Sequence, residues 1–257
     1  MSILKELWNK RSLIWSFATS DLKIRYRNSV LGFFWTVLEP LLMLAVLYVV
    51  FTSLFPSTIE NFGLYLLLGI ILWNALTRGT EIGLHSILGR SSLVNQIYFP
   101  REIPAISASI TSFLMVVFEF VVFIIFMIVF RFIPPNTIIY LPLVILLEFV
   151  LITGLCLPLS VLNVRFRDMQ FIWRLVLQVG FFLTPIFYKL DRLPENIQMI
   201  LKYSPMVQIV DMAHDVTIYG KMPSVESVET TVALVLVITL ICYLIFRIAE
   251  KRVIEEL

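Results

Sequence analysis

Side chains that could perform covalent or metal chemistry are few and scattered in this chain. Its two histidines, His85 and His214, stand far apart, and its two cysteines, Cys156 and Cys242, lie in separate apolar runs. Metal and nucleophilic sites need several such groups brought together, and no GxSxG, HExxH or Cys/His cluster marks one here. The chain also lacks a glycine-rich nucleotide-binding loop. We therefore expect no catalytic residue, no metal site and no cofactor on this chain.

Three acidic residues interrupt the apolar runs and form a second kind of candidate site. Glu39, Glu119 and Glu148 each fall in a different run. An ionisable group in hydrocarbon is costly, so each of them is a functional-site hypothesis. None has a basic partner at helical spacing, and Glu39 lies near the end of its run. Two interpretations stay open: hydrogen bonds between helices, or a proton-coupling role for Glu119 or Glu148.

Aromatic residues make up 14% of the chain, and many gather near the ends of the apolar runs. Such positions are typical of the aromatic belts at the two interfaces of a membrane. Aromatic faces also stack on sugar rings, so some of these residues are candidates for lining a conduit. Both interpretations remain open at this stage. The candidate conduit residues are Phe33, Trp35, Trp73, Phe181, Phe182 and Tyr188.

The composition indicates the element class that must position these groups. Hydrophobic residues make up 59% of the 257 residues and charged residues only 15%. Soluble domains carry about 25% charged residues, so this much apolar surface requires lipid as its solvent. We expect an all-α, polytopic membrane protein that forms a single domain over residues 1–257.

The apolar runs are long enough to cross a bilayer, which takes about 20 residues per helix. We expect six transmembrane helices, joined by short polar segments and one longer one at 189–227. The expected spans are 33–55, 64–88, 105–132, 137–164, 171–188 and 228–246.

Basic residues distinguish the two sides of the membrane. They concentrate in residues 1–30, 89–104 and 165–174 and in the C-terminal tail, and they are sparser in the segments between. Lys and Arg are enriched on the cytoplasmic side of membrane proteins. Both termini and the segment 89–104 are therefore expected in the cytoplasm, and the segment 189–227 is expected outside.

The N-terminal residues 1–30 are expected to form an amphipathic helix at the membrane interface. An apolar stripe at helical spacing includes Leu4, Trp8, Trp15 and Ala18, while basic residues occupy other faces. Tryptophan in the headgroup region and bases near phosphates are typical of interfacial helices. The alternative is a basic flank that only sets the topology.

The segment 89–104 is a polar island between two long apolar runs. Ser91 or Ser92 is placed to cap a short helix with one apolar side, and Tyr98-Phe99 would project an aromatic surface. Pro100 ends that helix by forcing the preceding residue into an extended conformation. A short, stiff helix with an exposed apolar side is a docking element for a soluble partner. The alternative is an ordinary helical hairpin turn.

The segment 189–227 contains two short, semi-apolar helices. One starts at Pro194 and the other at Ser204-Pro205. We expect both to re-enter the outer leaflet, where irregular backbone must be covered by protein or line a wet cavity. The alternative is a folded extracellular cap.

Three stretches together resemble the membrane subunits of ABC-2 type polysaccharide exporters, the permeases for O-antigen, capsule and teichoic acid. They are DLKIRYRNSVLGFFWTVLEPLL at 21–42, LVNQIYFPREIP at 93–104, and LNVRFRDMQFIWRLVLQVGFFLTPIFY at 162–188. With the six-span layout they cover nearly the whole chain. Departures from the family pattern at Glu39 and Met169-Gln170 concern the substrate rather than the fold.

This resemblance implies partners and roles for particular residues. It implies a homodimer joined to two ATP-binding-cassette ATPase subunits, which hold the ATP and Mg. The residues expected to couple to the ATPase are Ser92, Leu93, Asn95, Tyr98, Phe99, Pro100 and Arg101. The residues expected where a lipid-pyrophosphate group enters are Lys23, Arg25 and Arg27. The residues expected to form an external gate are Pro194, Ile197, Leu201, Pro205 and Val210.

The resemblance implies export of a lipid-linked polysaccharide across the bacterial cytoplasmic (inner) membrane, driven by the separate ATPase. Membrane lipids are then further partners, and nucleic acid is not. Two alternatives remain at this stage. One is an ABC-2 exporter of a drug or small lipid, and the other is a proton-coupled carrier.

Overall fold

A computed structural model describes residues 3–27, 29–54, 59–91 and 99–250. Regular structure in these ranges is entirely helical, with no strand. The all-α expectation is therefore confirmed.

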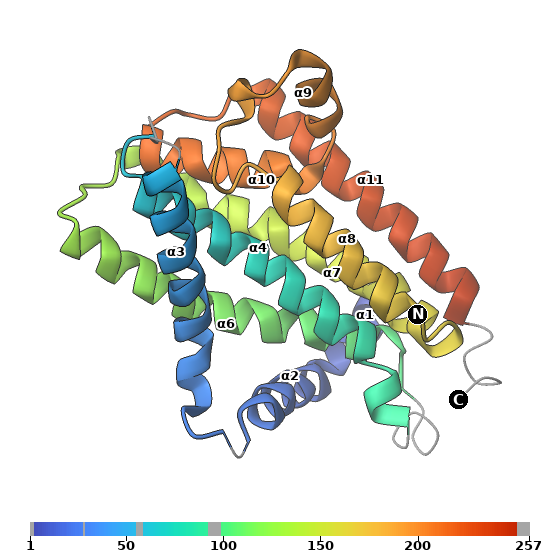
Figure 1. Ribbon diagram of the computed structural model, residues 1–257. Helices are drawn as coiled ribbons and strands as arrows, with labels where there is room; N and C mark the ends of the chain where they lie inside the picture. The colour runs from blue at the N-terminus through green and yellow to red at the C-terminus, as the bar shows by residue number, and fades with distance from the viewer. Residues whose placement is uncertain (1–2, 28, 55–58, 92–98, 251–257) are drawn as a thin grey trace.

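Five of the described helices are long and apolar enough to cross a membrane, so the chain is a multi-pass membrane protein. Figure 1 shows them packed side by side at varied angles. They are α3 (Trp35–Leu54), α4 (Phe62–His85), α6 (Glu102–Val129), α7 (Leu141–Arg165) and α11 (Val225–Ala249).

Helix α4 lies at the centre of this bundle, in contact with α3, α6, α7 and the shorter α8 (Met169–Leu183). Its most apolar window is 83% buried, against 17% for α3 and for α11. That window also has the lowest mean hydropathy of the five, 1.3. A helix that is shielded from lipid by its neighbours tolerates polar side chains, and this is where the polar groups of the site lie.

Small residues let α4 approach α7 closely. A Cβ added to Gly79 would lie 2.5 Å from Ile152 Cγ2, and one added to Gly83 would lie 2.4 Å from Cys156 Sγ. Interfaces of this kind are typical of membrane helices, whose association depends on close packing rather than on a hydrophobic driving force.

The expected span 171–188 ends earlier than predicted. Helix α8 has 15 residues, about 22 Å long, and stops at Leu183, short of the roughly 30 Å of a hydrocarbon core. Thr184 is extended (ψ 139°) because Pro185 follows it. The hydroxyl of Tyr65 donates to the carbonyls of Pro185 (3.0 Å) and Tyr188 (2.7 Å). These bonds satisfy backbone groups that the interrupted helix leaves free.

The N-terminal region is two helices rather than the single one that was expected. Helix α1 (Ile3–Asn9) and helix α2 (Arg11–Tyr26) meet at Lys10. The packing face of α2 agrees with the predicted stripe at Ala18, which is buried, but it includes Ile14 in place of Trp15, which is 55% exposed. The hydroxyl of Thr111 donates to the Ala18 carbonyl (3.2 Å), which joins α2 to α6.

The two ends of the bundle carry different short elements (Figure 1). The N-terminal helices, the turn at Leu88–Arg90, the start of α6 and the end of α11 lie towards one end. Helices α9 (Glu195–Leu201) and α10 (Pro205–His214) lie towards the other. The arrangement agrees with the expected sidedness of these segments, and the cytoplasmic assignment remains a prediction.

Candidate functional site: a trough along helix α4

Three cavities follow one another along the face of α4 that is turned towards α2, α3 and α8. Their volumes are about 680, 700 and 390 Å³. The first two share Arg25, the last two share Met43 and Asn74, and the first and third share Glu81. We call these three adjoining cavities the α4 trough.

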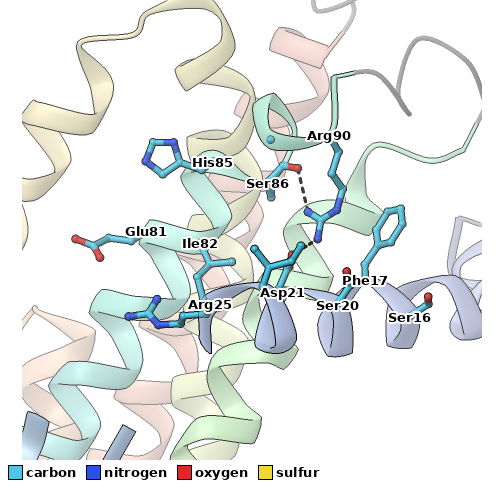
Figure 2. Close-up of a pocket in the computed structure, with 12 residues that line it drawn as sticks. Ser16, Phe17, Ser20, Asp21, Arg25, Glu81, Ile82, His85, Ser86 and Arg90 are labelled. Carbon is cyan, nitrogen blue, oxygen red and sulfur yellow. Dashed lines mark hydrogen bonds and ion pairs between the residues drawn. The ribbon is translucent and has the colours of Figure 1, made fainter. Parts of the chain in front are cut away.

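The first cavity lies between α2 and the end of α4 (Figure 2). Glu81 and His85 project from α4 on the side where Arg25 of α2 lies, and Ser16 and Ser20 complete the wall on α2. Cationic, anionic and hydroxyl groups thus line the same opening. This part of the trough can hold a polar, charged group at the end of the bundle where the N-terminal helices lie.

The trough continues between α3 and α8 with mixed polar and aromatic walls. The second cavity includes Trp35 and Glu39 of α3. The third includes Arg174 and Gln178 of α8 beside Thr77 of α4. Ionisable and amide groups at such depth must face protein or a water-filled cavity, because hydrocarbon leaves them unsatisfied. The mixed lining of the trough thus suits contact with water, polar cargo or another protein better than contact with lipid.

Four of the predicted conduit aromatics line this trough. Trp35 and Phe182 are exposed by 43% and 61%. Trp73 is buried behind the edge of Phe181, with ring centroids 6.1 Å apart and an interplanar angle of 69°. Gly180 allows this contact, since a Cβ there would lie 2.7 Å from the Trp73 ring.

The other two predicted conduit residues, Phe33 and Tyr188, are not among the residues that line these cavities. Phe33 packs edge-on against Tyr26 (5.3 Å between centroids) and against Phe118 of α6 (4.5 Å). Tyr188 folds back so that its hydroxyl donates to the Leu183 carbonyl (2.7 Å). Their aromatic character was visible in the sequence, but the direction of each ring depends on where α3 and α8 begin and end.

The three basic residues predicted at the entrance separate into two groups. Arg25 lines both the first and the second cavity. Lys23 and Arg27 are exposed but line neither. Lys23 is two residues from Arg25 and so lies on another face of α2, and Arg27 follows the end of that helix in an extended conformation. Arg25 follows Asp21 by one turn on the trough side.

Most of the segment predicted to dock the ATPase lies outside the described residues, namely Ser92, Leu93, Asn95 and Tyr98. The described part differs from one expectation. Phe99 is only 7% exposed and packs with Ile14 of α2 and Ile103 of α6, so it does not project an aromatic surface into water. The expectation of an exposed Phe99 is wrong for this chain, because α2 covers the position. Pro100 is half-buried, and Arg101 donates to the Glu250 carbonyl (2.5 Å).

The acids of the apolar runs have different surroundings. Glu119 of α6 forms a bidentate salt bridge with Arg78 of α4, in which both N–O distances are 2.6 Å and both side chains are buried. Hydrogen bonding between helices thus accounts for Glu119. By the orientation that the basic residues predict, Arg78 would be one of the cytoplasmic bases, and this is wrong: Arg78 lies inside the bundle. Glu148 of α7 is buried, and its Oε1 has no partner among the described residues.

The predicted gate residues lie on two unequal helices. Pro194, which precedes α9, and Ile197 of α9 are exposed. Leu201 and Val210 are buried, and Pro205 begins α10. Helix α10 packs against α4, α7 and α11. The gating role of these residues stays a prediction, and α10 is the part that is fixed in the bundle.

His214 attaches α10 to α4. Its ring stacks on that of Tyr65, with centroids 3.6 Å apart and an interplanar angle of 14°, and its Nε2 lies 2.9 Å from the Tyr65 carbonyl oxygen. Burial lowers the pKa of His214 to about 3, so the ring is neutral at physiological pH. Burial, with the charges of Asp215 and Asp191, raises the pKa of Asp211 to about 6. Among the described residues, no group of three His, Cys, Asp or Glu side chains could hold a metal ion.

Residues 12–218 match the family described as "ABC-2 type transporter". This match covers well over half of the chain, so the protein belongs to that family, and the predicted resemblance is confirmed.

Curated relatives extend the comparison to nearly the whole length. The chain is 26% identical over 257 residues to the O-antigen export system permease protein RfbA of Myxococcus xanthus, covering 99% of each chain. It is 27% identical over 203 residues to a protein of the same name from Klebsiella pneumoniae, covering 79% of this chain and 78% of the relative. It is 22% identical over 243 residues to the polysialic acid transport protein KpsM of Escherichia coli, covering 92% and 93%.

Proposed function

We propose that this protein is the permease subunit of an exporter that moves a lipid-linked polysaccharide across the bacterial inner membrane. ATP would be hydrolysed, with Mg, on a separate ATP-binding-cassette subunit. The names of the relatives, O-antigen export permease and polysialic acid transport protein, support the cargo class. The α4 trough supports the route.

The observation that carries the proposal is the mixed lining of the trough. Asn74 and Gln178 supply amides that can hydrogen-bond sugar hydroxyls, and Trp35 and Phe182 supply exposed aromatic faces for sugar rings. Such a surface favours a long polar polymer over a compact apolar molecule. An ABC-2 exporter of a drug or small lipid would need a more uniformly apolar pocket.

A second copy of the chain would close the trough into a conduit. The trough is an open surface of one subunit, flanked by α3 and α8, and carries ionisable groups such as Glu39 and Arg174. Lipid is a poor solvent for these groups, whereas the same face of a partner subunit would enclose water and cargo between the two. We therefore propose a homodimer with the trough at its interface.

Arg25 is placed to receive the anionic end of a lipid-linked cargo. It lies on the face of α2 that lines two cavities, next to a basic and aromatic interfacial region. Guanidinium groups form bidentate, charge-assisted hydrogen bonds with phosphate, and basic residues near a membrane surface attract anionic headgroups. With both termini in the cytoplasm, this end of the trough is where the cargo enters.

The force for export would come from the ATPase through the segment 89–104. We expect Leu93→Ala/Tyr98→Ala to release the ATPase from a permease that still folds, measured by co-purification and by the melting temperature. Phe99→Ala is a different case, because Phe99 is packed against α2 and contributes to the fold of the permease. Co-purification at the wild-type level in the double variant would refute docking at this segment.

The test of the route is site-specific photo-crosslinking in the producing cell. A p-benzoyl-phenylalanine at Phe182 should capture polysaccharide, detected as a glycan-positive, high-mass form of the permease that requires active ATPase. The matched control is the same group at Phe113, an exposed aromatic of α6 that does not line the trough. Equal capture at both positions, or capture at neither, would contradict the proposed route.

A proton-coupled carrier is the least favoured of the original alternatives. One of its two candidate groups, Glu119, is held in the salt bridge with Arg78. Export that continues in the cell after loss of the ATPase would support the carrier against the present proposal.

A further inference from the structure

One narrow stripe of α4 is open, and it is polar. Along the helix from Leu64 to His85, most residues are buried by the helices around it. Four of those that are not buried follow at spacings of three or four residues and so share one face. They are Asn74, Thr77, Glu81 and His85. This polar stripe runs along the wall of the trough, with Glu81 and His85 in the first cavity and the other two residues deeper in the bundle.

Two of the charged residues around the first cavity are already paired with each other. The Arg90 guanidinium donates to Asp21 Oδ1, and both side chains are largely buried (Figure 2). In the part of the chain that the structure describes, the Glu81 carboxylate and Nε2 of His85 have no hydrogen-bond partner, and Arg25 forms no salt bridge. The cavity therefore offers a guanidinium, a carboxylate and an imidazole to a ligand.

A buried amide on α7 sets the hydrogen-bonding role of His85. Asn163 is only 2% exposed, and its Nδ2 donates to the Leu84 carbonyl (3.0 Å) in the last turn of α4. A carbonyl oxygen only accepts, so this bond fixes which end of the amide faces α4. The same Nδ2 lies 3.4 Å from Nδ1 of His85. Nδ1 is therefore the acceptor, and the neutral ring carries its proton on Nε2.

Glu81 and His85 are complementary as hydrogen-bonding groups. Both project from α4 towards the same side (Figure 2), and Glu81 lies one turn deeper, about 6 Å along the helix axis. The carboxylate only accepts hydrogen bonds, and Nε2–H of the neutral His85 ring only donates. A sugar hydroxyl does both, so neighbouring hydroxyl groups of one sugar ring can satisfy the two side chains together. A phosphate group only accepts, and Glu81 would repel it.

We propose that Glu81 and His85 form a sugar-binding subsite at the entrance of the trough, beside the position at which Arg25 receives the anionic end of the cargo. The proposal rests on the proposed function. The ligand of this subsite is the sugar ring nearest to the lipid-linked phosphate, bound through neighbouring hydroxyl groups that accept from His85 and donate to Glu81. Asn163 is a positioning residue, because it acts through His85 and does not touch the cargo.

The test compares export with capture of the cargo at the first cavity. Glu81→Met and His85→Phe remove the acceptor and the donor at similar side-chain size, whereas Glu81→Gln and His85→Gln return an amide acceptor and an N–H donor. The control is Glu229→Gln, an exposed glutamate of α11 that lines none of the three cavities. Surface polysaccharide and co-purifying ATPase are measured for each variant in the producing cell. A second set carries p-benzoyl-phenylalanine at Ile24, an exposed residue on the α2 wall of the cavity, and reports captured glycan.

We expect Glu81→Met and His85→Phe to retain the ATPase and to lower both export and capture by about ten-fold or more, because each leaves a hydrogen bond of the cargo unmade. The two Gln variants should recover part of this loss, and Glu229→Gln should behave as wild type. Wild-type export and capture by Glu81→Met and His85→Phe would overturn the proposal. So would Gln variants as impaired as these two, or loss of the ATPase, which would assign the residues to assembly.

A spectroscopic measurement tests the positioning of His85 without ATPase or cargo. The chain has two histidines, so the ring nitrogens of ¹⁵N-histidine-labelled permease give two sets of signals, and His214→Phe identifies the set of His85. At mildly alkaline pH, His85 should carry its proton on Nε2, and Asn163→Leu should produce a mixture of the two tautomers. A proton on Nδ1 in the wild type would overturn the subsite. If the tautomer is as expected while deletion of the permease leaves the surface polysaccharide unchanged, the geometry of His85 stands and the proposed function fails.

Discussion

Several polar residues inside this bundle pair with one another across helices. Arg78 and Glu119 satisfy each other on α4 and α6, and Ser112 donates to the Ala75 carbonyl (2.7 Å) between the same helices. A buried ion pair is weak evidence for net stability, but loss of one partner leaves an uncompensated charge. The pair therefore constrains how α4 and α6 are placed relative to each other.

Arg78→Met should destabilise the permease by about 3–5 kcal/mol, because Glu119 is then left charged and unpaired in a dry site. Arg78→Met/Glu119→Leu should recover most of this loss, since neither charge remains. Thermal unfolding can be followed with a thiol-reactive dye, because Cys156 and Cys242 are both buried in the folded chain. A single variant as stable as wild type would show that the pair is solvated.

Close contact between α4 and α7 leads to a second residue-scale prediction. Gly83→Ala would place a Cβ 2.4 Å from Cys156 Sγ and 3.2 Å from its Cα, so backbone must move. Overpacking of this kind costs about 1–3 kcal/mol. Gly89→Ala is the control, because its Cβ would meet nothing within 4 Å. A melting temperature lowered equally in both variants would contradict this explanation.

Among the elements, α2 and α10 differ in the way they join the bundle. Helix α2 buries only Ile14 and Ala18 and packs on α6 along that one face, where Thr111 donates to the Ala18 carbonyl, whereas α10 is buried on most of its length and stacked on α4 through His214. An element that is buried on one face shifts more easily than one that is buried on most of its surface. If the outer end of the trough opens, the exposed α9 is the better candidate for the moving part.

The attachment of α10 has a pH dependence that follows from His214. Burial lowers the pKa of the His214 ring from 6.5 to about 3. Between these two pH values the ring is protonated in the unfolded chain and neutral in the folded chain. Stability is therefore full above pH 6.5 and is lost as the pH falls towards 3, by about 3 kcal/mol at pH 4.5. The raised pKa of Asp211 acts in the opposite sense, since its protonation in the folded state favours folding as the pH falls through 6.

His214→Phe should therefore lose less stability than wild type between pH 7 and 4.5, because the ring stack on Tyr65 is retained and the titrating group is removed. Melting temperatures of the two proteins across this range provide the measurement. If the melting temperatures of the two proteins fall equally with pH, protonation of His214 does not cause the loss of stability.

At the scale of the whole molecule, the trough side differs in polarity from the outer faces of α6 and α11. Helices α6 and α11 expose apolar side chains such as Ile124, Ile128, Leu240 and Leu244, as a surface in contact with lipid requires. The trough side instead exposes Glu39 and Gln178. This asymmetry is what a subunit needs if one of its faces meets a partner and water while the others meet lipid.

Arg25→Gln should therefore reduce export far more than Arg27→Gln, although the two residues are equivalent in the sequence pattern. Loss of one charge-assisted contact to a phosphate costs about 1.5–3 kcal/mol, so a fall of roughly ten-fold or more is expected for Arg25→Gln. Surface polysaccharide is measured, with ATPase co-purification as the control for assembly. If both variants lose export equally, the number of basic residues matters and the position of Arg25 at the trough does not.

The sequence predicted the element class well because composition decides it. Apolar runs of about 20 residues must be helical in lipid, where every backbone group needs an internal partner, so α3, α4, α6, α7 and α11 could be placed to within a few residues. The sequence predicted the C-terminal end of α8 less well. Pro185 in an apolar run was read as part of a span, and the end of the helix at Leu183 is held by bonds from Tyr65, over 100 residues earlier.

The site was predictable only in its residue types. The aromatic and basic candidates were named from the sequence, but which of them meet depends on the rotation of each helix about its axis. Arg25 lies in the last turn of α2, whereas Arg27 follows the end of the helix in an extended conformation, and only the end of α2 and its packing on α6 decide which one faces the trough. The same is true of Phe99. The sequence predicted that this ring is exposed, but helix α2 covers it in the folded chain.

By itself, the sequence determined that this is a multi-helical membrane protein without a nucleotide-binding loop, with a polar segment at 89–104 set between apolar runs. Only the tertiary structure decided the pairing of Arg78 with Glu119, the placement of the three cavities of the α4 trough and the packing of α2 on α6. The physical reason is that helix formation in lipid depends on local composition. Contacts between helices depend on crossing geometry and rotation, and these join residues as far apart as Asp21 and Arg90, 69 positions along the chain.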